Sequence, residues 1–247
     1  MDLYTVIKLI ILSLVAGLAT FIGVFIGSCR DFGKKGLVFG TSFAAGIMIL
    51  ISAFELIPGS VKESNLTNAL VFLIAGFVVV WLLNLVIPHL HSVKNLEDCD
   101  DKYLMKMSYL LAFGLILHDF PEGFAIASSY AYSVSLGLLV VFGLFIHNIP
   151  EGYTLSVASS RFRNKKFNYK SAFFSTLSTT FGTILGIILI GSFGALGSIF
   201  NAIAAGAMIF ISLHELIPTA IKYKDNKTLV AGFVASILIY VVLGLLI

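Results

Sequence analysis

Long apolar stretches dominate this chain and constrain its fold more than any other feature. A helix needs about 20 mostly apolar residues to cross a bilayer, and stretches of that length recur throughout the 247 residues. Charged residues make up only 12% of the chain, whereas about 25% is usual in globular proteins. So few charges cannot cover the surface of a soluble protein of this size. The sequence therefore predicts an all-α polytopic membrane protein whose main solvent is lipid.

We predict eight transmembrane helices. The expected spans are residues 9–29, 36–57, 64–88, 104–131, 134–160, two helices within 171–213, and 228–247. The segment 171–213 is too long for one helix, and Gly191, Gly194 and Gly197 mark its expected break. The first apolar run is too long for a cleaved signal peptide, and no positive cluster precedes it. We therefore expect it to be retained as the first helix.

The basic residues predict the orientation. With eight spans, the loops after the first, third, fifth and seventh helices share one face and hold 14 of the 16 Lys and Arg residues. Only Lys8 and Lys62 fall on the other face. Because cytoplasmic loops collect Lys and Arg, both termini are expected outside the plasma or inner membrane. The net charge of +3 comes from short basic runs, so we expect no nucleic-acid binding.

Two internal repeats predict the domain organisation. Residues 44–62 and 204–222 are identical at 12 of 19 positions, yet they cross the membrane in opposite directions. Between them lie HDFPEG at 118–123 and HNIPEG at 147–152. Inverted repeats are typical of secondary transporters, which bind substrate near the midplane.

We therefore predict a single transmembrane domain over residues 1–247 with a 3+2+3 arrangement of helices. Its inverted repeats are expected at about 1–88 and 168–247, around a central helix pair at about 104–160. A cytoplasmic loop is expected at about 89–103.

Eight ionisable side chains fall inside the predicted spans, and none has an intramembrane Lys or Arg beside it. They are Glu55, His118, Asp119, Glu122, His147, Glu151, His214 and Glu215. An ionised side chain at the bilayer centre costs about 2.5–3.5 kcal/mol on insertion scales. The five carboxylates must therefore be protonated or lie around a bound cation.

The spacing of these residues favours a metal ion. His118 and Glu122 are four residues apart and share one face of a helix, with Asp119 beside them. His147, Asn148 and Glu151 repeat the arrangement on the next helix. Imidazole and carboxylate ligands suit Zn²⁺, and also Fe²⁺ and Mn²⁺.

Other residues in the spans have open roles. Pro121 and Pro150 each free a backbone carbonyl about one turn earlier, which is tolerated at membrane depth where it lines a cavity. Glu55, His214 and Glu215 are candidates for proton relays, gates or accessory ligands, with a purely structural role as the alternative. Glu55 and Glu215 are expected near opposite faces of the membrane.

The motifs HDFPEG and HNIPEG, together with HELIPTA at 214–220, resemble the ZIP family of divalent-metal transporters, in its bacterial and GufA-like branches. The resemblance implies uptake of Zn²⁺ toward the cytoplasm, with Fe²⁺, Mn²⁺ and Cd²⁺ as further candidate substrates and no organic cofactor. It implies a primary site formed by His118, Glu122, His147 and Glu151. It also implies a homodimer as a candidate assembly.

The resemblance further implies a second metal site toward Asp119 and Asn148, bridged by Glu122 and Glu151. This chain departs from the family there, because Thr179 stands where several members have Glu. A hydroxyl is a weaker, neutral ligand, so we expect the second site to be weak or absent.

The loop after the third span carries His89, His91 and Cys99. A metal-receiving role for these residues is one interpretation, and an ordinary solvated loop is the other.

Two alternatives to an importer are open at this stage. An intramembrane zinc hydrolase also buries His and acidic side chains, although the zinc-protease motif H-E-x-x-H does not occur in this sequence. An exporter or metal-gated channel of the same fold is the second. The favoured hypothesis is alternating access, in which the metal exchanges water for protein ligands at the midplane.

Overall fold

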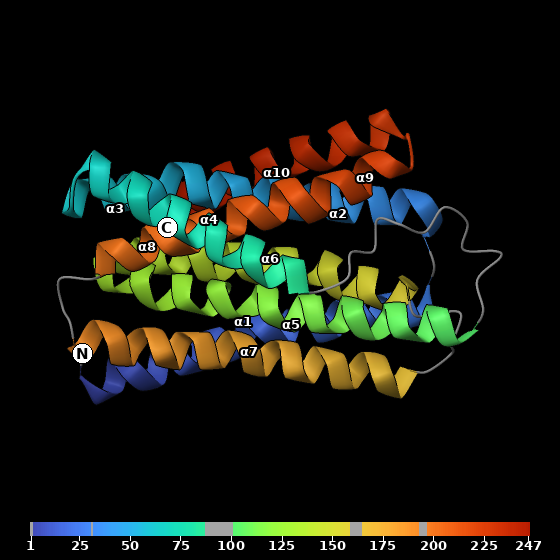
Figure 1. Ribbon diagram of the computed structural model, residues 1–247, viewed down its shortest axis with the longest axis horizontal. Helices are drawn as coiled ribbons and strands as arrows, with labels where there is room; N and C mark the ends of the chain where they lie inside the picture. The colour runs from blue at the N-terminus through green and yellow to red at the C-terminus, as the bar shows by residue number, and fades with distance from the viewer. Residues whose placement is uncertain (1, 31, 87–100, 159–164, 193–196) are drawn as a thin grey trace.

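The computed structural model of the protein describes residues 2–30, 32–86, 101–158, 165–192 and 197–247. Within these ranges, the side chains of residues 101–108, 110 and 111 are not described. Every regular element in the described residues is helical. The longer helices run side by side along the long axis of the molecule (Figure 1).

The helices follow the predicted order along the chain. They are α1 (Leu3–Cys29), α2 (Gly33–Ile51), α3 (Ile57–Glu63), α4 (Leu66–Val86), α5 (Asp101–Tyr132), α6 (Val134–Ala158), α7 (Lys165–Ser192), α8 (Gly197–Ile211), α9 (Ile217–Lys222) and α10 (Asn226–Leu246). Two π-helical turns join α2 to α3 and α8 to α9, at Ser52–Leu56 and Ser212–Leu216. The predicted break within 171–213 lies between α7 and α8.

Two predicted helix ends are wrong. The second span was expected to end near Ile57 and the seventh near Leu213, but the helical path continues to Glu63 and to Lys222. Pro58 and Pro218 lie in the first turns of α3 and α9. Proline lacks the N–H that the interior of a helix uses, and at each of these prolines the preceding π turn changes the hydrogen-bond spacing from four to five residues. Each π turn therefore lets the chain pass a proline without leaving the helical path.

Among the described residues, seven helical segments are long and apolar enough to cross a membrane. They are Leu3–Cys29, Gly33–Glu63, Leu66–Leu85, Val134–Val157, Lys165–Ser192, Gly197–Lys222 and Asn226–Leu246. Helix α5, which corresponds to the fourth predicted span, is not among these seven. It has 32 residues, but His118, Asp119 and Glu122 interrupt its apolar run.

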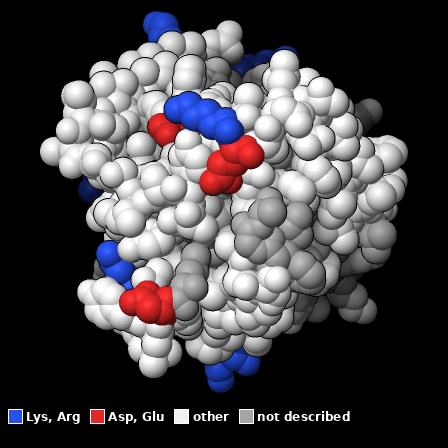
Figure 2. Space-filling model, turned by 90° about the vertical axis from the view of Figure 1, so that its left-hand side faces the viewer, with Lys and Arg blue, Asp and Glu red and all other residues white. Residues whose placement is uncertain are grey.

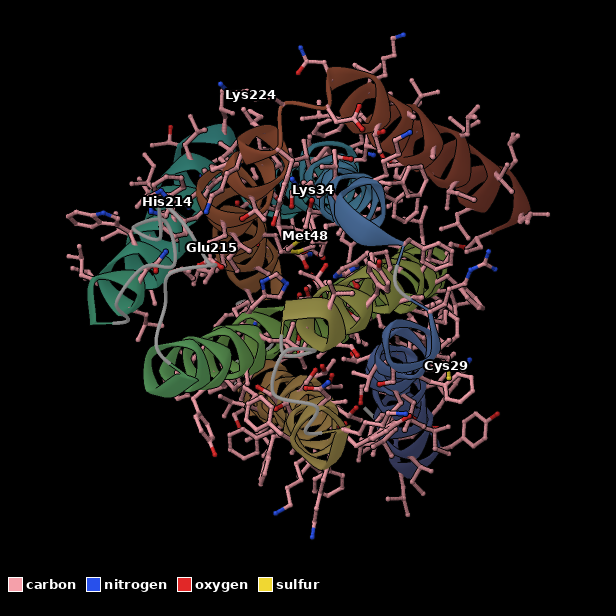
Figure 3. All side chains as sticks on the ribbon, turned by 90° about the vertical axis from the view of Figure 1, so that its right-hand side faces the viewer. Cys29, Lys34, Met48, His214, Glu215 and Lys224 are labelled. Carbon is pink, nitrogen blue, oxygen red and sulfur yellow. The ribbon has the colours of Figure 1, made fainter. Side chains whose placement is uncertain are left out.

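The α5–α6 pair occupies the middle of the bundle. Seen along the helices, α1 and α7 lie on one side of it, and α2, α4, α8, α9 and α10 lie on the other (Figure 3). Helix α1 packs on α6 and α7 packs on α5, while α2 packs on α10 and α8 packs on α4. Contacts of α2 with α6 and of α8 with α5 join the two groups.

Glycines allow the closest of these approaches. A methyl group at Gly123 would overlap the carbonyl oxygen of Thr179 in α7, and one at Gly152 would overlap that of Thr20 in α1. These are the glycines that end HDFPEG and HNIPEG. The motif glycines therefore bring α5 against α7 and α6 against α1.

The two ends of the bundle differ in charge. The right-hand end in Figure 1, which faces the viewer in Figure 3, carries Lys34 and Lys224. The other described basic side chains near this end are Arg30, Lys35, Lys165, Lys166, Lys170, Lys222 and Lys227. The left-hand end, shown in Figure 2, has few charged side chains, and both chain termini lie toward it.

Candidate metal site

One turn of α5 and one turn of α6 bring four side chains together at the centre of the bundle. His118 and Glu122 come from α5, and His147 and Glu151 from α6. One ligand atom from each lies within 4.8 Å of all the others, and all four residues are buried. These are the four residues that the sequence predicted for the primary site.

The distances within the cluster match a single cation. His118 Nε2 lies 2.9 Å from Glu122 Oε1 and 2.9 Å from Glu151 Oε1. His147 Nε2 lies 3.0 Å from Glu122 Oε1 and 3.7 Å from Glu151 Oε1. Ligand atoms at Zn²⁺ bonding distances in a tetrahedron are about 3.3 Å apart. The four side chains therefore suit a cation of this size with only small adjustments.

The surroundings orient the imidazole of His147. Its Nδ1 lies 3.1 Å from the carbonyl oxygen of Gly143, one turn earlier in α6. A hydrogen bond there places a proton on Nδ1 and directs Nε2, which lies 3.0 Å from Glu122 Oε1, into the cluster. Backbone carbonyls commonly support metal-bound histidines in this way.

The residues that follow the two histidines face the side of the α5–α6 pair on which α1 and α7 lie. Asp119 accepts a hydrogen bond from the Ser175 hydroxyl in α7. Asn148 donates from Nδ2 to the carbonyl oxygen of Ala16 in α1 at 3.0 Å. Thr179 is fully buried, and its hydroxyl donates to the Ser175 carbonyl oxygen at 3.3 Å.

Several buried oxygens at this centre accept no hydrogen bond from any described residue. They are Asp119 Oδ1, Glu122 Oε2, Asn148 Oδ1, Glu151 Oε1 and Glu151 Oε2. Carboxylate oxygens are acceptors only when ionised, and buried charges need a partner of opposite sign. The chemistry of this donor set therefore fits a bound cation.

A cavity of about 90 Å³ adjoins the cluster at His118 and Glu151. One water needs roughly 10–15 Å³, so several fit. Its lining includes His118, Glu151, Thr41, Thr154 and Glu215. These parts of α2, α5, α6 and the π turn Ser212–Leu216 lie in the half of the bundle that carries most of the described basic side chains.

The other half is packed with apolar side chains. The largest buried cluster there includes Ile51, Leu56, Ile126, Leu144 and Phe210. In this structure the metal site therefore adjoins a cavity on one side and dense packing on the other.

The accessory candidates lie outside the four-residue cluster. Glu215 accepts a hydrogen bond from Asn84 Nδ2 of α4 at 3.1 Å, and Glu55 accepts one from the Tyr240 hydroxyl of α10 at 2.5 Å. The ring of His214 stacks on Phe210 with centroids 4.9 Å apart. The loop candidates His89, His91 and Cys99 lie outside the described residues.

Sequence reasoning missed Ser175 and the two donors to the glutamates, Asn84 and Tyr240. Ser175 had a usable signal, because Ser171, Ser175, Thr179 and Thr183 recur every fourth residue and so share one face of α7. Asn84 and Tyr240 had none beyond being polar residues in apolar helices.

The fold and the site define a multi-helix membrane protein with a buried cluster that could hold a metal ion. Comparison with known proteins identifies the class: residues 88–247 match the family described as ZIP Zinc transporter. The chain is also similar over most of its length to proteins named Zinc transporter ZupT. It is 34% identical to that of Chlorobium chlorochromatii, covering 92% of this chain and 93% of the relative.

For the ZupT of Clostridium perfringens, the identity is 33%, with 98% and 96% covered. For that of Escherichia coli O7:K1, it is 32%, with 88% of each chain covered. The chain therefore belongs to the ZIP family and is a multi-pass membrane protein. Its relatives are named as transporters, so the hydrolase alternative is wrong and the protein is not an enzyme.

Proposed function

We propose that this protein carries Zn²⁺ across the membrane into the cytoplasm through the site formed by His118, Glu122, His147 and Glu151. The observation that carries the proposal is the buried convergence of two imidazoles and two carboxylates from α5 and α6. Family membership and the names of the relatives support zinc as the substrate. Fe²⁺, Mn²⁺ and Cd²⁺ remain predicted alternative substrates.

The proposal includes a 3+2+3 inverted-repeat architecture within one domain. The helix contacts support it, because they occur in related pairs. The α1–α6 contact corresponds to α7–α5, and the α2–α10 contact corresponds to α8–α4. Glycine pairs mark the same correspondences: Gly76 and Gly206 lie at the α4–α8 contact, and Gly46 and Gly232 at the α2–α10 contact.

Transport would proceed by alternating access to this site. The basic end of the bundle is proposed to be cytoplasmic, with both termini outside, following the usual distribution of Lys and Arg. The cavity beside His118 and Glu151 would then be the cytoplasmic exit. Ligands must be deprotonated to bind a metal, so protonation of Glu122 or His118 would assist release.

A second, weaker metal position is proposed beside the first, toward Asp119 and Asn148. The unpaired oxygens of both side chains support it. Thr179 lies next to Ser175 on α7 and offers only a hydroxyl, already donated to a backbone carbonyl. The homodimer also remains a prediction.

Zinc uptake into proteoliposomes tests the function. Purified protein should import Zn²⁺, and Glu122→Ala and Glu151→Ala should each abolish uptake, because each removes a carboxylate from the cluster. Glu63→Ala, at the end of α3 and outside the cluster, is the control and should keep normal uptake. Normal zinc flux in both cluster variants would contradict the proposal. Uptake with and without a pH gradient, compared with efflux, separates an importer from an exporter or channel.

A further inference from the structure

The cavity beside the metal site has a repeat-related counterpart in the packed half of the bundle. Residues 44–62 correspond to residues 204–222 by an offset of 160, and HDFPEG corresponds to HNIPEG by an offset of 29. By these offsets, Thr41 and Glu215 of the cavity lining correspond to Asn201 and Glu55. His118 and Glu151 correspond to His147 and Glu122.

The counterpart residues are packed together in this structure. Leu144, Ala125, Ile126 and Leu56 correspond to cavity-lining residues, and all four are fully buried in the same apolar cluster. One copy of the repeated element therefore lines a cavity on one side of the candidate site. The other copy is packed without a cavity on the opposite side.

Asn201 is the exception to this apolar packing. It is fully buried, and neither its Nδ2 nor its Oδ1 has a hydrogen-bond partner among the described residues. Its counterpart Thr41 satisfies its hydroxyl locally by donating to the Leu37 carbonyl oxygen at 2.7 Å. A buried polar group without a hydrogen-bond partner destabilises the packed state. The Asn201 side chain therefore does not stabilise the closed packing of this half.

Glu55 is the second polar member of the counterpart set. The Tyr240 hydroxyl holds it from α10, as Asn84 holds Glu215 from α4. The two donors are themselves repeat-related, because each lies eight residues after the corresponding glycine, Gly232 or Gly76. Each repeat thus keeps one carboxylate in place with a donor from its neighbouring helix. Only Glu215 lines the cavity described here.

We propose that Asn201 and Glu55 line the route by which the divalent cation reaches the metal site from the outer face. When that half opens, water reaches the Asn201 side-chain amide. The Glu55 carboxylate then contacts the hydrated ion before the ion reaches His147 and Glu122. Tyr240 acts as a positioning residue for Glu55. This inference rests on the proposed transport function.

Thiol accessibility tests the route directly. Cys29 and Cys99 are first replaced by Ser, and Asn201→Cys is then probed with a membrane-impermeant maleimide added outside intact cells. Asn201→Cys should be alkylated from outside, whereas Thr41→Cys should be alkylated only in inverted vesicles. Ala202→Cys is the matched control: it is equally buried and one residue away, but its counterpart Ser42 lies against Gly232 of α10. It should react at least about tenfold more slowly than Asn201→Cys.

The outcome that overturns the proposal is equal labelling of Asn201→Cys and Ala202→Cys, or labelling of Asn201→Cys only from the cytoplasmic side. Zinc uptake by the cysteine-free parent is measured alongside. A parent that takes up no zinc contradicts the transport function itself, whereas a transporting parent with an unlabelled Asn201→Cys contradicts only the route.

A second variant separates a route residue from a structural one. Asn201→Leu has nearly the same shape and removes the unsatisfied amide, so the melting temperature should be unchanged or higher. Zinc uptake should nevertheless fall at least about tenfold, since an apolar residue stabilises the closed state, and about 1.4 kcal/mol suffices for that change. Asn201→Ser should retain most of the uptake. Normal uptake by Asn201→Leu, or a lower melting temperature with a matching loss of uptake, would oppose the proposal.

Discussion

The motifs on α5 and α6 can be compared residue by residue. Both supply a histidine and a glutamate to the cluster, and both end in a glycine that touches a neighbouring helix. They differ at the residue after the histidine, which is Asp119 in α5 and Asn148 in α6. They also differ in exposure, since His118 lines the cavity whereas His147 is fully buried. The repeated motif therefore builds the candidate site, and the differences between its two copies set the charge and the access of that site.

The largest expected effect follows from removing either imidazole. His118→Ala and His147→Ala should each lower Zn²⁺ affinity at least about 100-fold, because losing an outer-shell partner alone costs roughly 10–100-fold. Calorimetric titration of the purified variants measures this. If one variant keeps normal affinity while the other loses it, the two histidines are not equivalent ligands.

The next effect concerns the motif glycines. Gly123→Ala and Gly152→Ala should each destabilise the protein by about 1–3 kcal/mol, because the added methyl overlaps a backbone carbonyl of the neighbouring helix. Thermal unfolding of the detergent-solubilised protein measures the loss. Gly191→Ala is the control, since a methyl there meets no atom within 4 Å. If all three variants melt alike, the close contacts of α5 and α6 are not required.

The smallest expected effect separates the second metal position from the first. Wild-type protein should bind one Zn²⁺ tightly, and Asp119→Asn should weaken only the second, weaker binding event. Asn148→Asp should strengthen that event about tenfold, because even in water a divalent ion and a carboxylate about 6 Å apart attract by about 1.4 kcal/mol. Titration with Zn²⁺ distinguishes the two events. Two equally tight sites in the wild type would show that Thr179 does not weaken the second site.

Much of the site was predictable because its chemistry is local in the sequence. His118 and Glu122 share a helix face by their spacing alone, and the matching spacing in the next helix predicted their partners. The donors to the glutamates were not predictable in this way. Tyr240 lies 185 residues from Glu55 and Asn84 lies 131 residues from Glu215, and only helix packing joins them.

The sequence by itself determined the solvent, the helices and the four central candidate ligands, because hydropathy, charge and residue spacing are properties of short segments. It also indicated the inverted repeat, because identical residues recur at fixed offsets. Only the tertiary structure decided which half of the bundle holds a cavity and which half is closed. The repeat-related positions there hold similar but not identical residues, such as Thr41 and Asn201. Which set lines a cavity depends on the relative positions of helices that are far apart in the sequence, which no single segment specifies.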